Sequence, residues 1–118
     1  MITTTHTEES LIEMRVEGKV THEDYEKLTP QMDEIIERHG KLDCLIEMKG
    51  VKSIEPKAIL DDLKFDVRHA GDFNKVALVT DKTWHELATK LWSVFFPKAK
   101  VKCFDHDERD AAEKWVRE

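Results

Sequence analysis

The side chains that could take part in chemistry are few in this sequence. The densest set able to bind a metal ion is Asp105-His106-Asp107-Glu108. Such acidic residues also cap a helix, because carboxylates are favourable at its N-terminus. Asp81 follows an apolar run typical of a buried strand, where open α/β sheets bind ligands but where an aspartate can also begin a helix. Capping is the favoured interpretation of both, so we predict no metal site.

Motifs of nucleotide-binding and catalytic sites are missing from the sequence. The four glycines do not form a G-x-G-x-x-G or Walker pattern, and there is no G-x-S-x-G, H-E-x-x-H or paired-cysteine motif. His69 and His85 fall in two predicted helices, at opposite ends of them. A structural role is favoured for His69 because a histidine near a helix C-terminus is stabilised by the helix dipole. We therefore predict no catalytic residues, no cofactor and no enzyme activity.

The strongest signal is an aromatic stripe in residues 84–97. Read as a helix, this segment places apolar residues at i, i+3, i+4, i+7, i+8 and i+11, which is one continuous stripe. Two Trp and two Phe within four turns exceed what a helix that only covers a sheet requires. A plain core helix and a homodimer interface remain alternatives to an apolar-ligand or membrane surface. The stripe comprises Trp84, Leu87, Ala88, Leu91, Trp92 and Phe95, with Phe96 beside it.

Charge is spread unevenly along the chain. The net charge of −6 argues against a nucleic-acid partner, which would need a basic face. Residues 82–102 nevertheless contain five lysines and one glutamate. This is either an ordinary solvated mixture of charges or a basic, aromatic edge suited to anionic lipid head groups. The predicted ligand- or membrane-binding residues are Phe65, Trp84, Leu91, Trp92, Phe95 and Phe96 for apolar contact, and Lys82, Lys90 and Lys98 for head groups.

The elements that must position these residues follow from hydrophobic periodicity. A length of 118 residues fits a single domain, residues 1–118, with its own core. The alternation of strand and helix patterns predicts an α/β protein of order ββαβαβαβα, whose single mixed, mainly parallel sheet has an N-terminal hairpin at its edge and flanking helices. The predicted strands cover residues 2–5, 10–17, 42–48, 75–80 and 101–104, and the helices follow residues 21, 56, 81 and 105.

Local signals set several of these boundaries. Residues 10–17 alternate with a period of two, which predicts a half-exposed strand that Gly18 ends. Thr21 is the predicted N-cap of the first helix with Asp24 three residues later, and Gly40 ends that helix. Pro30 predicts a kink or a restart within it. The buried face of the last helix is predicted to hold Ala111, Ala112, Trp115 and Val116.

Compartment signals agree with one another. The two cysteines, Cys44 and Cys103, lie in strand-like apolar runs and read as reduced core thiols. There is no run of about 18 apolar residues, and residues 1–6 lack the features of a signal peptide. We expect a cytoplasmic protein, with peripheral contact at the membrane if the lipid interpretation holds.

Four segments resemble the SpoIIAA-like family of small bacterial proteins: residues 15–25, 62–65, 75–79 and 84–97. The final Ala111/Trp115 helix fits as well, so the resemblance extends over nearly the whole chain. It implies a STAS-like fold, similar also to the CRAL-TRIO lipid-exchange fold, and binding of apolar ligands or membranes. STAS anti-sigma antagonists carry an Asp-Ser-Ser-Gly motif with a phosphorylated Ser. Here the corresponding stretch is Ile54-Glu55-Pro56-Lys57-Ala58, which has no hydroxyl.

Two functions follow as expectations. The first is a non-catalytic binding module for a lipid, an acyl chain or a membrane surface. The alternative is a STAS-type protein-interaction or regulatory module that lacks the phosphorylatable serine and binds a partner or a second copy through the same apolar face.

Overall fold

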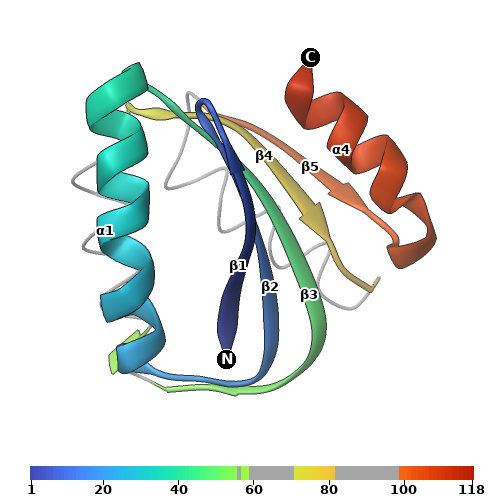
Figure 1. Cartoon of the computed structure of the whole chain (residues 1–118). Coiled ribbons are helices and arrows are strands. Elements are labelled where there is room, and N and C mark those ends of the chain that lie inside the picture. The colour runs from blue at the N-terminus through green and yellow to red at the C-terminus, as the bar shows by residue number, and fades with distance from the viewer. Residues whose placement is uncertain (56, 59–70, 82–98) are drawn as a thin grey trace.

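The computed structural model describes residues 1–55, 57–58, 71–81 and 99–118. In these residues a curved sheet lies between two helices (Figure 1). The elements are β1 (Ile2–Glu8), β2 (Leu11–Val20), α1 (His22–His39), β3 (Leu42–Ile54), β4 (Phe73–Val79), β5 (Lys100–Phe104), a 3₁₀ turn (His106–Glu108) and α4 (Arg109–Arg117). No helix in these described ranges is both long and apolar enough to cross a bilayer.

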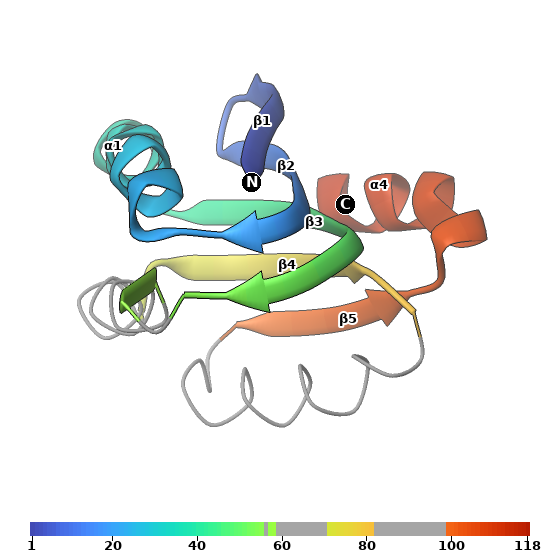
Figure 2. The same cartoon turned by 90° about the horizontal axis from the view of Figure 1, so that it is seen from below.

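The sheet has five strands in the order β1-β2-β3-β4-β5 (Figure 2). In the described part of the chain the one antiparallel pair is β1–β2, joined by a tight turn in which Glu9 has a φ of 51°. The pairs β2–β3, β3–β4 and β4–β5 are parallel. The single mixed, mainly parallel sheet with a hairpin at its edge is therefore confirmed.

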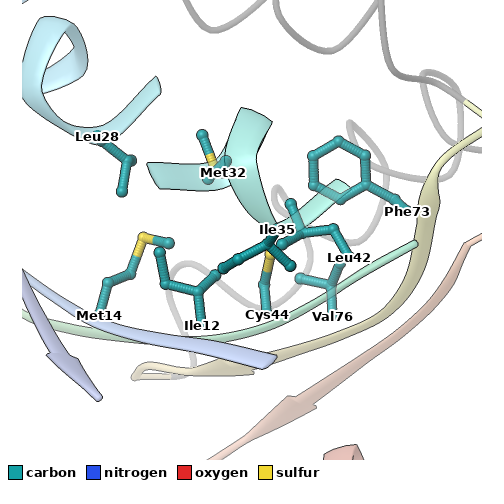
Figure 3. Close-up of a cluster of buried hydrophobic side chains, with 9 residues drawn as sticks. All are labelled: Ile12, Met14, Leu28, Met32, Ile35, Leu42, Cys44, Phe73 and Val76. Carbon is teal, nitrogen blue, oxygen red and sulfur yellow. The ribbon is translucent and has the colours of Figure 1, made fainter. Parts of the chain in front are cut away.

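The face of the sheet that α1 covers carries the larger apolar cluster (Figure 3). Side chains from α1 point toward side chains from β2, β3 and β4, because alternate strand residues share one face and helix residues four apart share another. Burying each aliphatic side chain in such a cluster contributes about 1.5–3 kcal/mol. The buried members are Ile12, Met14, Leu28, Met32, Ile35, Leu42, Cys44, Phe73 and Val76.

The ends of α1 are fixed by the predicted residues. The Thr21 side chain accepts a hydrogen bond from the Asp24 N–H at 3.3 Å, and the Asp24 carboxylate accepts one from the Thr21 N–H at 2.8 Å. Gly40 ends the helix in the left-handed conformation, with a φ of 72°. Pro30 lies inside one continuous helix, so α1 does not restart there, and a kink, the other outcome predicted for Pro30, stays a prediction. The packing of α1 on the sheet favours the helical path beyond the proline.

Strand β2 does not end at Gly18, contrary to the prediction. It continues to Val20, and the pairing with β3 shifts register on both sides of Gly18. Gly18 has a φ of 57°, so it forms an irregularity within the strand rather than its end. Strand β3 also extends beyond the predicted residue 48, to Ile54, which gives the end of β2 a partner.

The opposite face of the sheet packs against α4. Ala112 and Val116 are its buried residues, and they lie four apart on one side of the helix. Ala111 was predicted on the same face but is exposed, because it is one residue out of this spacing. The buried cluster on this face contains Leu11, Leu45, Ala77, Val79, Phe104, Ala112 and Val116.

Candidate functional site

The predicted binding surface lies outside the described residues. This applies to every member of the set, and also to the histidines at 69 and 85. The set consists of Phe65, Trp84, Leu91, Trp92, Phe95, Phe96, Lys82, Lys90 and Lys98. Their role therefore stays a prediction.

The start of the segment after β3 is described. Lys57 and Ala58 are helical. Ala58 is fully buried in a cluster with Val16 and Val20, against which Tyr25 of α1 also packs. The segment that follows β3 thus begins on the α1 side of the sheet, as a crossover between parallel strands requires.

A polar cleft of about 350 Å³ opens at the starts of β2, β3 and β4. Its deepest acidic side chain is Asp43, which is only 6% exposed. One carboxylate oxygen accepts a hydrogen bond from the Ser10 hydroxyl at 2.7 Å. The other accepts from the Asn74 amide at 2.9 Å and from the Lys75 N–H at 3.2 Å. These bonds join three strands, so Asp43 stabilises the sheet rather than offering open coordination sites to a ligand.

A second buried carboxylate, Glu13, lies on the α4 face of β2 and is 3% exposed. One of its oxygens accepts from Arg109 at 3.1 Å and the other from Arg117 at 3.3 Å. Arg109 also approaches Glu47 at 3.5 Å. The prediction placed this face of β2 in solvent, which is wrong at Glu13. Its partners lie about a hundred residues away in the sequence, so the local pattern carries no sign of them.

The nearby carboxylates shift the pKa of both arginines. Burial alone would lower the pKa of Arg109, but its hydrogen bond to Glu13 and its attraction to nearby carboxylates outweigh burial and raise the pKa. A hydrogen bond to Glu8 is the main cause that raises the pKa of Arg117. Both guanidinium groups are therefore charged, as arginine is in proteins generally.

Trp115 contacts a different part of the sheet from the two arginines of α4. Its ring is 6.1 Å from that of Phe104. The Lys75 ammonium group is 5.3 Å from the centre of the Trp115 ring and donates a hydrogen bond to the Trp115 carbonyl at 3.2 Å. These contacts fix α4 on the sheet through a cation–π interaction.

Asp105 is the N-cap of the 3₁₀ turn before α4, whereas the N-cap of α4 itself is Glu108, so the prediction that Asp105 or Asp107 caps this helix is wrong. The Glu108 carboxylate accepts a hydrogen bond from the Asp105 N–H at 3.0 Å. Carboxylate oxygens of Asp105, Asp107 and Glu108 lie within 4.8 Å of one another, and the last two residues are exposed. Asp81, the other acid singled out in the sequence, is exposed just after β4.

A solved structure resembles this chain over almost its full length. It is an uncharacterised protein of the DUF3478 family with a SpoIIAA-like fold, from Shewanella loihica PV-4. The two share 30% identity with a TM-score of 0.74, covering 98% of this chain and 92% of the other. No curated protein matches this chain. Residues 11–117 match the family described as SpoIIAA-like, and the chain belongs to that family.

Proposed function

We propose that this SpoIIAA-like domain is a non-catalytic module that binds a lipid, an acyl chain or a membrane surface through residues 57–70 and 82–98. The observation that carries the proposal is the aromatic stripe, in which Trp84, Trp92, Phe95 and Phe96 fall within one predicted helix. A helix needs one apolar face to cover a sheet, and here the last turn is apolar nearly all round.

The packing of the described residues supports this interpretation. Among the described residues, nine buried side chains from α1, β2, β3 and β4 form an apolar cluster under α1. Partly buried Ala99 and Val101, which follow the aromatic segment, pack against the same cluster. The crossover rule predicts that the segment joining β4 to β5 lies on this side as well. Its aromatic side chains are therefore expected beside a core that is already well supplied with apolar groups.

Charge gives independent support. The aromatic segment is bordered by Lys82, Lys90 and Lys98 on a chain of net charge −6. Lysine side chains bind anionic head groups while their apolar stems extend over hydrocarbon. A ligand with an apolar tail and an anionic head fits this combination better than a neutral hydrocarbon.

Vesicle binding tests the proposal. Trp115 would obscure the emission of the aromatic segment, so the Trp115→Phe variant is used, which leaves Trp84 and Trp92 as the only tryptophans. We expect this variant to co-sediment with vesicles containing anionic phospholipid at low salt, with a blue shift of tryptophan emission. Unchanged emission together with no co-sedimentation would refute the membrane and lipid interpretation.

A charge-matched pair of variants identifies the surface. Replacing Lys82, Lys90 and Lys98 by Gln should weaken vesicle binding, with roughly 1 kcal/mol expected for each lysine near an anionic surface. Replacing three exposed lysines elsewhere by Gln should have little effect, although the net charge changes equally. Equal loss in both variants would show that binding depends on overall charge and not on this segment. The three control lysines are Lys27, Lys41 and Lys114.

A second candidate is a STAS-type protein-interaction module, which the family match favours. It would act without a phosphorylation switch, because the stretch from Ile54 to Ala58 has no hydroxyl group. The double variant Trp92→Ala, Phe96→Ala separates the candidates. Loss of a dimer in light scattering with vesicle binding retained would favour the interaction module, and the reverse would favour lipid binding.

A further inference from the structure

We infer that α4 is a cover that detaches from the sheet as a unit while α1 and the strands stay folded. The first observation is how little apolar surface holds it. Of its nine residues, only Ala112 and Val116 are buried, and Trp115 is half-buried. Helices of this length are not stable in water by themselves, so α4 depends on what it docks against.

The second observation is a row of charges that joins α4 to β2. Arg109, Glu113 and Arg117 are four residues apart and therefore lie along one side of the helix. Glu113 pairs with Arg109 at 3.1 Å and with Arg117 at 3.2 Å. Each arginine then donates to a different oxygen of Glu13. Glu113 holds both arginines in the geometry that a single buried carboxylate requires.

This arrangement couples the two ends of α4. Arg109 begins the helix and Arg117 ends it, and both bind the same carboxylate. If one arginine leaves, Glu13 stays buried with half of its pairing lost, which is unfavourable in a site of low dielectric. If both leave with the helix, Glu13 is reached by water and all the charges are solvated. Complete detachment is thus favoured over partial detachment.

Detachment would uncover an apolar face of the sheet. Under α4 lie side chains of β2, β3, β4 and β5, and most of them are almost completely buried. Glu13 and Glu47 border this face. It is opposite the face covered by α1 (Figure 1), so opening does not require α1 to move. The residues uncovered are Leu11, Leu45, Ala77, Val79 and Phe104.

Amide hydrogen exchange measured by NMR on the full chain tests the inference. The reporters are the amides of residues 113–117, since the first four amides of a helix lack helical partners. We expect these five amides to share one opening constant, at least tenfold larger than that of amides in β2, β3 and β4. A gradient of protection that falls steadily toward the end of the helix would indicate fraying and would overturn the inference.

The variant Glu13→Gln removes the charge that binds both arginines. It should raise the shared opening constant of residues 113–117 by about tenfold or more, and leave exchange in α1 unchanged. The control is Arg38→Gln, which removes an exposed pair with Glu34 on α1 and should not affect α4. If the amides of α4 in Glu13→Gln have the same opening constant as the amides of β2, β3 and β4, the inference is wrong.

Arg117→Gln gives a second route, should Glu13→Gln not fold. The Arg117 side chain is 36% exposed, and after its replacement Glu13 keeps Arg109 as a partner. It removes one of the two arginine contacts with Glu13, and we expect the same uniform rise in the exchange of residues 113–116. A rise confined to the amide next to the substitution would contradict the coupling of the two helix ends.

Discussion

Two replacements of Asp43 separate the geometry of this buried side chain from its charge. In the native protein, one oxygen binds the Ser10 hydroxyl and the other binds the Asn74 amide and the Lys75 N–H. Asn can reproduce this pattern: its carbonyl oxygen accepts from Asn74 and Lys75, and its NH₂ group donates to the Ser10 oxygen. A hydroxyl accepts as readily as it donates, so in Asp43→Asn only the Ser10 O–H needs a new acceptor, which water in the neighbouring cleft can supply.

The expected magnitudes differ severalfold. Asp43→Ala leaves three donors without their acceptor at a site that is 6% exposed. The loss of hydrogen bonds to a charged group costs about 1.5–3 kcal/mol for each. The neighbouring cleft admits water and compensates in part, so we expect about 3–4 kcal/mol of destabilisation in total. Asp43→Asn keeps a hydrogen bond with each of the three partners, with the one to Ser10 reversed, and loses the charge, for which we expect about 1 kcal/mol in total.

Urea unfolding followed by circular dichroism measures both values. The control is Glu37→Ala, which removes an exposed acid from α1 and should change the free energy of unfolding by less than about 0.5 kcal/mol. Equal destabilisation by Asp43→Asn and Asp43→Ala would show that the charge, and not the acceptor geometry, stabilises the strands. That result would refute the reasoning from the three hydrogen bonds.

Two further predictions concern the ends of α1. Burial raises the pKa of Asp24, but hydrogen bonds from Thr21 outweigh it, so the pKa is lowered on folding. Asp24 therefore contributes stability above its unfolded pKa of about 3.9, and this stability is lost as pH falls through the folded pKa. In thermal unfolding, Asp24→Asn should be less stable than the native protein at neutral pH, and the difference should shrink toward zero in acid. Gly40→Ala should lower the free energy of unfolding in urea by about 1 kcal/mol, because an alanine is strained at a φ of 72°. An added Cβ meets no atom within 4 Å, so no steric clash adds to this strain. A neutral effect would contradict this prediction.

The features that the sequence predicted well are those set by neighbouring residues. Thr21 and Asp24 are three residues apart, and their reciprocal hydrogen bonds form wherever the helix begins. Gly40 ends the helix for a reason that concerns its own backbone. The mainly parallel sheet followed from the alternation of strand and helix patterns, which permits few arrangements of the strands.

The continuation of β2 through Gly18 and of α1 through Pro30 share one cause. Both residues disfavour regular structure locally, and in both cases packing with distant residues outweighs the local preference. Gly18 lies between residues of β2 that pair with β3, and Pro30 lies between residues of α1 that are buried on the sheet. A single sequence shows the local penalty but not the tertiary contacts that exceed it.

The buried acids could not have been found from their neighbours either. Period-two alternation assigns Glu13 to the polar face of β2, and nothing nearby indicates that two arginines from α4 enclose it. This error bears on function because Glu13 lies on the face of the sheet that α4 covers. Ala58, where the predicted surface begins, packs on the α1 side. If the two faces act independently, Glu13→Gln should loosen α4 and leave vesicle binding unchanged. Altered vesicle binding in that variant would instead mean that the sheet couples α4 to the aromatic segment.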